Sequence, residues 1–248
     1  MKITDEPAFV LHARPWRESS LLVEMLTANH GRVGVVARGV TGPKKQVLKA
    51  ALQPLQFLRV DLDQRGEMAR LIQAEAVDIA PRLSGYALLC GFYLNELTMR
   101  LAPRGDAQGD LFLAYSQTRS RIADPSENLA WTLRRFERDL LDAVGVGFSW
   151  HLDRDGVELD PAARYLVDAE QGPVKVLSER DASERAFTPS GRALLALASD
   201  QMPSLDDLTS LRVPMRVLLQ HHLGARGLKS WDMMRVMAVS RARAAVRQ

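Results

Sequence analysis

Apolar and polar positions alternate along the first 80 residues in a pattern that predicts a small β-rich region. Glycine and proline separate five short strand-like runs, at residues 8–13, 20–27, 32–38, 55–62 and 69–77. The stretch between the third and fourth runs, residues 45–52, has the pattern of a short helix. Five strands with a helix at this place predict a closed barrel of the oligonucleotide-binding (OB) type.

The hydrophobic period becomes helical after residue 80. The pattern predicts three helices up to about residue 145, which begin at Ser84, Asp110 and Ser126, the last with Ser126 as its N-cap. Three more helices are predicted later in the chain, at residues 188–198, at 204–223 and from 230 onward, with a frayed basic tail over 240–248.

Residues 151–187 interrupt this helical pattern. They are acidic and rich in Asp, and they contain two short extended runs, at 164–168 and 174–177. We therefore predict an α+β protein with an N-terminal five-stranded OB-fold barrel over residues 1–80. An α-helical domain over residues 81–248 follows, and it carries the acidic stretch as a small irregular or β insert.

Charge is distributed unevenly along the chain, although the formal net charge is only +3. Residues 10–50 hold seven Lys or Arg and two acidic residues, whereas residues 151–211 hold twelve acidic and six basic residues. Residues 212–248 hold eight basic residues and one acidic residue. Two basic ends suit an anionic partner such as a phosphate backbone, and solvated charge without a partner is the alternative.

The basic residues of the first region are the predicted DNA contacts. They occur at the ends of the strand-like runs and just after the third run: Arg14, Arg17, Arg32, Arg38, Lys44, Lys45 and Lys49. Trp16 lies between two of them and could stack on a base, whereas Phe9 and Phe57 lie within apolar runs and are predicted core residues. Strand-end arginines can equally serve solubility alone. Arg226 and Lys229, in the helix break G-A-R-G-L-K-S, are further candidates for contact with DNA or a partner.

Common signatures of catalysis do not occur in the sequence. It contains no G-x-x-x-x-G-K-[ST], H-E-x-x-H or G-x-S-x-G motif, so we predict that the protein is not an enzyme. A metal-dependent enzyme with an unfamiliar site is the weaker alternative, and its candidate ligands are Asp153, Asp155, Glu158 and Asp160.

Cysteine content and hydropathy predict the cellular setting. Cys90 is the only cysteine, so the chain is expected to form no intrachain disulfide and to hold neither zinc nor another cofactor. The first residues lack the apolar core of a signal peptide, and no apolar run reaches the length of a membrane span. We expect a cytoplasmic protein.

Six motifs occur in order along the chain. The first three are F-V-L-H-A-R-P-W-R-E-S-S-L-L at residues 9–22, G-R-V-G-V-V-A-R-G at 31–39 and A-L-Q-P-L at 51–55. The others are Y-L-N-E-L at 93–97, L-R-R-F-E at 133–137 and L-G-A-R-G-L-K-S-W at 223–231. Together they resemble the RecO family of bacterial recombination mediators over the whole length of the chain.

The resemblance implies an OB barrel joined to a helical domain and no enzymatic turnover. It also implies binding to single- and double-stranded DNA, annealing of complementary strands, and binding to the acidic C-terminal tail of the single-stranded DNA-binding protein. With the partner RecR, the family helps RecA to displace that protein from gaps, which implies association with the nucleoid at damaged DNA. Many relatives carry a four-cysteine zinc module near residues 151–172, where this chain has no cysteine, so zinc is not expected. A generic DNA- or RNA-binding OB module without mediator activity is the alternative.

A site for such an acidic, aromatic-ended tail needs a cation beside an apolar groove. The L-R-R-F-E motif offers Arg134 and Arg135 as cations and Leu133 and Phe136 as apolar neighbours, so these four residues are the predicted tail site. The alternative is that Leu133 and Phe136 belong to the core and the arginines form a solvated face.

Overall fold

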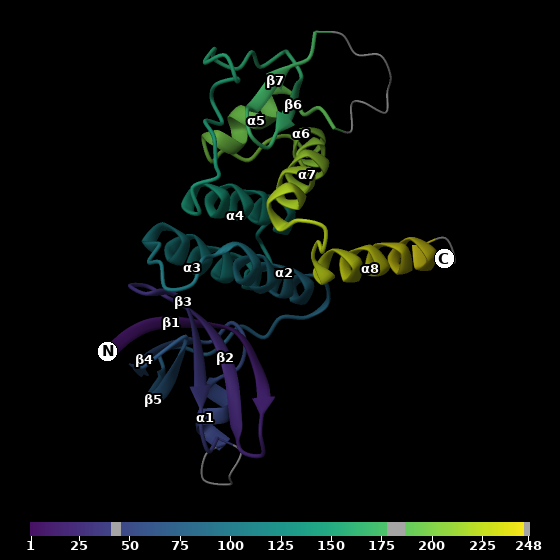
Figure 1. Ribbon diagram of the computed structural model, residues 1–248. Helices are drawn as coiled ribbons and strands as arrows, with labels where there is room; N and C mark the ends of the chain where they lie inside the picture. Colours follow the sequence, from purple (N-terminus) through teal and green to yellow (C-terminus); the bar gives the residue numbers. More distant parts are fainter. Residues whose placement is uncertain (41–45, 178–186, 246–248) are drawn as a thin grey trace. The chain divides into compact units, whose positions relative to one another are not determined.

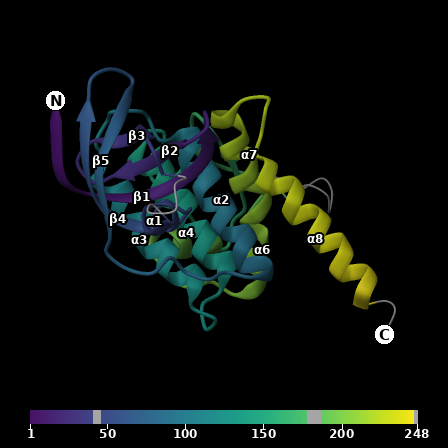
Figure 2. The ribbon, with the colours of Figure 1, turned by 90° about the horizontal axis from the view of Figure 1, so that it is seen from below.

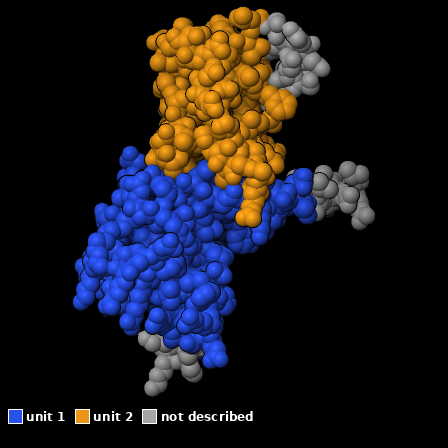
Figure 3. Space-filling view, in the orientation of Figure 1, with its two compact units in different colours: residues 1–125, 228–248 blue, residues 126–227 orange. Residues whose placement is uncertain are grey.

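A computed structural model describes residues 1–40, 46–177 and 187–245 of the chain (Figure 1). By internal contacts the chain divides into two compact units, which Figure 3 shows in different colours. Unit 1 comprises residues 1–125 and 228–248, and unit 2 comprises residues 126–227. The predicted domain boundary near residue 80 stays a prediction.

Unit 1 begins with a closed five-stranded barrel. Its strand order is β1-β2-β3-β5-β4, with β3 and β5 parallel and the other neighbours antiparallel. A short helix lies between the third and fourth strands, as the sequence predicts. The bounds are β1 Lys2–Trp16, β2 Ser20–Thr27, β3 Gly31–Ala37, α1 Gln46–Ala51, β4 Phe57–Gln64 and β5 Met68–Ala76. This arrangement confirms the predicted OB-type barrel.

Alternating side chains fill the barrel. Val10, Val23, Val35, Leu58 and Val60 are buried in one apolar cluster to which β1, β2, β3 and β4 all contribute. Strand β1 is much longer than the predicted run at 8–13, because its first half pairs with β4 and its second half with β2. A long strand that joins two neighbours closes the barrel and removes its free edges.

Three helices complete unit 1: α2 Gly85–Leu101, α3 Gly109–Ala123 and α8 Lys229–Ala245. Phe9 of the barrel stacks on Phe57, with 4.7 Å between ring centroids, and lies 4.9 Å from the ring of Tyr115 on α3. Arg119 of α3 is buried, holds Asp78 at 2.8 Å and lies over the Phe9 ring. Phe9 is buried and Phe57 is half-buried, so aromatic stacking and the ion pair of the buried Arg119 with the exposed Asp78 fix α3 on the barrel.

The C-terminal helix is attached to α2 by a carboxylate. Glu96 of α2 accepts hydrogen bonds from the backbone amides of Lys229 and Ser230, at 2.9 and 2.8 Å, and from the Ser230 hydroxyl at 2.6 Å. These bonds satisfy amides at the start of α8 that have no acceptor within the helix. In both ribbon views α8 starts at α2, and its far end extends clear of the other elements of unit 1 (Figures 1 and 2). The expected frayed tail is therefore wrong as far as Ala245, where the backbone is still helical.

Unit 2 contains four helices and a two-stranded sheet among its described residues. Their bounds are α4 Leu129–Ala143, β6 Tyr165–Asp168, β7 Gly172–Lys175, α5 Gly191–Ala198, α6 Leu205–Ser210 and α7 Arg212–Leu223. The antiparallel pair β6 and β7 corresponds to the two extended runs predicted in the acidic insert.

Three helix boundaries in unit 2 differ from the prediction. Asn128, not Ser126, caps α4, and its side chain accepts from the amide of Trp131 at 3.1 Å. Helix α5 begins after Ser190, whose hydroxyl caps it, instead of at residue 188. The helix predicted over 204–223 is two helices, because the chain turns at Leu211. None of the helices in the described part of the chain combines the length and apolar character needed to cross a bilayer.

Candidate nucleic-acid interface

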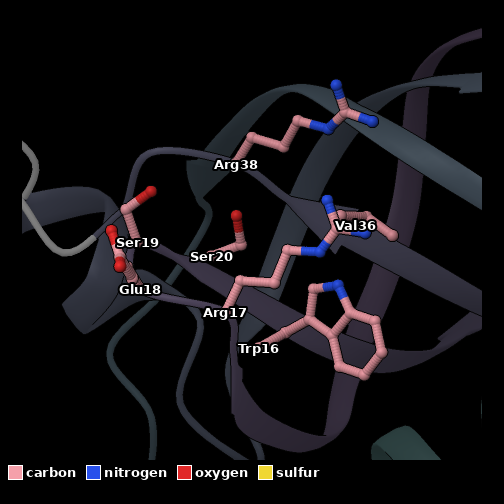
Figure 4. Close-up of a pocket in the computed structure, with 7 residues that line it drawn as sticks. All are labelled: Trp16, Arg17, Glu18, Ser19, Ser20, Val36 and Arg38. Carbon is pink, nitrogen blue, oxygen red and sulfur yellow. The ribbon is translucent and has the colours of Figure 1, made fainter.

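A groove lies where the β1–β2 hairpin meets the end of β3 (Figure 4). Its volume is about 880 Å³, and its lining residues are Trp16, Arg17, Glu18, Ser19, Ser20, Val36 and Arg38. The strand register explains this grouping: Trp16 pairs with Ser20 across a three-residue turn, and Leu21 pairs with Ala37. Arg38 therefore lies next to the hairpin although it is far from Trp16 in sequence. We call this site the hairpin groove.

Two guanidinium groups lie close to the ring of Trp16, one from a residue of the groove lining and one from Arg14 beside it. The Cζ atoms of Arg14 and Arg17 lie 6.0 and 5.9 Å from the centroid of its ring, which is cation–π distance. The Trp16 side chain is nevertheless 40% exposed. Arg17 occupies the left-handed region with φ 55°, a conformation that the tight turn requires. An exposed indole flanked by cations can stack on an unpaired base while the cations contact phosphates.

The electrostatics of the hairpin groove favour anions. Arg14, Arg17 and Arg38 are exposed, and none of them takes part in the ion pairs formed among the described residues. Glu18 is the one acid in the lining, and Figure 4 shows its side chain on the opposite side of the turn from the arginine side chains. Arg17, Arg38 and Trp16 point to the same side. The groove therefore presents positive charge that no carboxylate in the described part of the chain pairs with.

Arg32 does not belong to the hairpin groove, because it lies at the other end of β3. Six residues separate it from Arg38, which corresponds to roughly 20 Å along a strand. Its side chain donates to Glu24 at 3.1 Å and to the carbonyl of Ala102 at 2.9 Å. Burial, and then the charge of Arg104, lower the pKa of Arg32 from its ordinary value, whereas Glu24 acts to raise it.

Arg104, which lies beside Arg32, is a basic residue that the sequence patterns did not indicate. It follows α2 in an irregular segment, and only the fold brings it to Glu24 and Arg32. Gly34 allows this approach, because a Cβ atom there would lie 2.7 Å from Nη1 of Arg104. No local signal in the sequence distinguishes Arg104 from other exposed arginines.

The other predicted DNA contacts lie outside the lining of the hairpin groove. Lys44 and Lys45 fall outside the described residues. Lys49 is exposed on α1. Arg226 is exposed in the loop after α7 in unit 2, and Lys229 is exposed at the start of α8 in unit 1. Their role in DNA binding stays a prediction.

The predicted tail site on α4 does not have the geometry that the prediction requires. Leu133 and Phe136 are buried in unit 2, so they do not line an exposed apolar groove. Arg134 pairs with the fully buried Glu137, and Arg135 pairs with Asp200. Leu133 and Phe136 therefore lie in the core, as the alternative interpretation predicts. Arg134 and Arg135 form ion pairs, whereas that interpretation predicts a solvated face. A role of these residues in binding a partner stays a prediction.

Acidic side chains of the insert serve as turn formers. Oδ1 of Asp153 accepts from the amides of Asp155 and Val157 at 3.0 and 2.9 Å. Asp160 accepts from the amide of Ala162 and pairs with Lys175. Over the described parts of the chain, no group of three or more His, Cys, Asp or Glu side chains is arranged to hold a metal ion.

The barrel and its cationic groove are typical of nucleic-acid-binding OB-fold proteins. Comparison with known proteins narrows this class. The family described as "Recombination protein O N terminal" matches residues 1–80, and "Recombination protein O C terminal" matches residues 82–232. The chain belongs to the RecO family, and its role is in DNA repair and recombination.

Full-length relatives support this membership. The chain is 58% identical over 241 residues to the DNA repair protein RecO of Stenotrophomonas maltophilia (strain K279a), covering 97% of this chain and 100% of the relative. It is 56% identical over 233 residues to DNA repair protein RecO of Xylella fastidiosa (strain 9a5c), covering 94% and 96%. The corresponding protein of Xanthomonas euvesicatoria pv. vesicatoria (strain 85-10) is 56% identical over 238 residues, covering 96% and 99%. These names refer to DNA repair and state no catalytic activity.

Proposed function

We propose that the protein is a recombination mediator that binds single- and double-stranded DNA and anneals complementary strands. The observation that carries this proposal is the hairpin groove on an OB-type barrel, whose lining includes Arg17, Arg38 and an exposed Trp16, with Arg14 near the Trp16 ring. Membership of a DNA repair family supports DNA as the partner.

Binding in this groove is driven by phosphate neutralisation. Each arginine that meets a phosphate releases condensed counterions, so the affinity tolerates any sequence and falls as salt rises. A mediator that acts at gaps of any sequence requires this type of affinity.

Annealing follows from the same charge. A strand neutralised in the groove repels a second strand less, which lowers the barrier to their encounter. Trp16 is the one aromatic residue in the lining, so most bases of a bound strand keep their pairing edges free.

The proposed partners are those of a mediator at single-stranded gaps. The protein binds the acidic tail of the single-stranded DNA-binding protein and acts with RecR to promote loading of RecA. No catalytic step is required, because displacement of a bound protein can be driven by binding energy alone.

The test is annealing of two complementary oligonucleotides coated with the cognate single-stranded DNA-binding protein, across a salt series. The test variant is Arg17→Glu/Arg38→Glu. The matched control is Arg59→Glu/Arg65→Glu, which changes the net charge equally at barrel residues outside the groove lining. We expect the wild-type protein and the control to anneal and the groove variant to fail. For the groove variant, the slope of log affinity for single-stranded DNA against log salt concentration should become shallower by about 1.4, because two phosphate contacts disappear.

Three outcomes would contradict the proposal. If the wild-type protein binds DNA but does not anneal coated strands, it is a binding module without mediator activity. If matched RNA competes as well as DNA, the module is not specific for DNA. Equal losses in the groove and control variants would show that binding depends on net charge and not on the groove.

A further inference from the structure

A second cationic cavity lies at the opposite end of β3 from the hairpin groove. Its volume is about 590 Å³, and it is formed within unit 1. Its polar wall includes Arg32, Arg104 and His30, with Glu67 as its one acid, and its apolar wall includes Ile3, Val33 and Met68. We call it the Arg32–Arg104 pocket.

Most hydrogen-bond donors of Arg32 and Arg104 form no bond with the residues that the structure describes. A guanidinium group has five N–H donors. Arg32 donates through Nε to Ala102 and through Nη1 to Glu24, whereas Arg104 donates through Nη2 to Glu24. These are the bonds that the two side chains form with described residues, so each keeps at least three N–H groups for another acceptor.

The charge of the two arginines is only partly paired within the described part of the chain. Both guanidinium groups pair with a single carboxylate, Glu24, and neither forms an ion pair with Glu67, the acid in the pocket lining. Arg32 is held in this position, because its side chain is 15% exposed and donates to the backbone carbonyl of Ala102. Two neighbouring guanidinium groups with unused planar N–H donors can bind one phosphate through charge-assisted hydrogen bonds.

We propose that the Arg32–Arg104 pocket binds the phosphate of a nucleotide, with the apolar wall against its sugar or base. The volume lies within the range of sites for small ligands and exceeds what a lone phosphate fills. The nucleotide comes either from a DNA strand or from the free pool. In the first case the proposal rests on the proposed function and adds a second contact roughly 20 Å from the hairpin groove.

Calorimetric titration with deoxyadenosine 5′-monophosphate, deoxyadenosine and inorganic phosphate tests the pocket directly. We expect the monophosphate to bind more tightly than the nucleoside or phosphate alone. Arg104→Ala should weaken its binding about tenfold or more, because charge-assisted hydrogen bonds are lost. Arg59→Ala is the matched control and should change nothing, since both side chains are 46% exposed and both pair with a carboxylate.

Two further variants guard against a folding defect. Arg104→Lys keeps the charge beside Glu24 but removes the planar fork, so it should weaken binding less than Arg104→Ala. Glu24→Gln removes the competing acid and should strengthen phosphate binding. Opposite signs for Glu24→Gln and Arg104→Ala cannot arise from unfolding. Equal affinities for nucleotide and nucleoside, no measurable binding, or an unchanged affinity in Arg104→Ala would overturn the proposal.

Oligonucleotides with 5′-phosphate or 5′-hydroxyl ends identify the source of the phosphate. A preference for the phosphorylated end that depends on Arg104 supports a strand terminus. An equal Arg104-dependent loss for both ends supports an internal phosphodiester, and monophosphate binding with no effect on either oligonucleotide supports a free nucleotide. If Arg17→Glu/Arg38→Glu leaves DNA binding intact while the monophosphate results hold, the proposed function fails and the pocket stands.

Discussion

The arginines of the hairpin groove and the arginines of α4 occupy similar sequence motifs, R-P-W-R and L-R-R-F-E, but opposite environments. Arg17 and Arg38 are exposed at the ends of strands and form no ion pair among the described residues. Arg134 and Arg135 are mostly buried and paired, and the aromatic residue next to them, Phe136, is in the core. An aromatic residue beside arginines therefore does not by itself indicate a binding site.

The two sets of arginines differ because the arginines of α4 have acidic partners. These acids are either remote in sequence or buried on the same helix. Asp200, the partner of Arg135, is 65 residues away along the chain. Glu137, the partner of Arg134, is fully buried and so requires a cation beside it. In the hairpin groove no described acid fulfils this role, which leaves the arginines available for an external anion.

The largest effect expected from this comparison is a loss of stability in Arg134→Ala. The substitution leaves the Glu137 carboxylate buried without its cation, which should lower the free energy of unfolding by about 3 kcal/mol. Urea denaturation followed by circular dichroism measures it. Arg154→Ala is the control in the same unit, because its ion pair with Asp155 is exposed and should contribute less than ~0.5 kcal/mol. Unchanged stability together with lost binding of the acidic tail would instead support the predicted partner site.

The converse variant, Arg17→Ala/Arg38→Ala, should separate binding from stability. We expect single-strand affinity to fall roughly tenfold to a hundredfold, because two charge-assisted contacts with phosphate disappear. The free energy of unfolding should change by less than about 0.5 kcal/mol, since neither side chain is buried or paired among the described residues. Fluorescence anisotropy and urea denaturation on the same samples compare the two quantities. A stability loss as large as that of Arg134→Ala would remove the contrast between the two regions.

Trp16 allows a finer test of the hairpin groove. Trp16→Ala should weaken single-strand binding by about 1 kcal/mol through lost stacking and leave duplex binding nearly unchanged, because duplex bases are already stacked. Trp16→Phe keeps an aromatic face and should retain most of the affinity. Parallel anisotropy titrations with single-stranded and duplex DNA provide the measurement. If both substrates lose affinity equally, Trp16 positions the arginines and does not stack on a base.

The smallest effect concerns a carboxylate in unit 2 and depends on pH. Burial alone would raise the pKa of Asp207, but hydrogen bonds from Ser190, Ser204 and Arg192 outweigh it and hold the pKa below its ordinary value. A carboxylate whose pKa is lower in the folded state stabilises the fold at pH values above its pKa in the unfolded state, which is about 4. This contribution is lost as the pH falls through the pKa of the folded state. We expect the stability advantage of the wild-type protein over Asp207→Asn to shrink below about pH 4. Urea denaturation over a pH series checks this, and a constant difference would contradict it.

Local patterns predicted the barrel well because each strand carries its own period and turn residues. They underestimated β1, since its length depends on pairing with both β2 and β4. They placed the α4 cap at Ser126 because both Ser126 and Asn128 are good caps, and only the fold selects Asn128. They likewise missed the break at Leu211, although Pro214 in the first turn of α7 is a local signal for a new helix start.

The fold brings together only some of the candidate site residues that the sequence grouped. Trp16, Arg17 and Arg38 lie together because the hairpin and a neighbouring strand are close in sequence and fix their register. Arg32 was grouped with them by sequence, but a strand of seven residues carries its two ends apart. Arg104 could not be found, since its approach to Arg32 depends on where the chain runs after α2.

The carboxylate cap that Glu96 provides for α8 has a consequence for the time course of biosynthesis. Residues 126–227 are made between the two sequence segments of unit 1, and at ribosomal speeds of ~5–20 residues per second this interval lasts roughly 5–20 s. During it, Glu96 has no amide to accept from and the face of α2 that α8 contacts is uncovered. The nascent barrel can close early, but its unit is completed only when the ribosome has delivered α8, so chaperone binding in this interval would fall on α2.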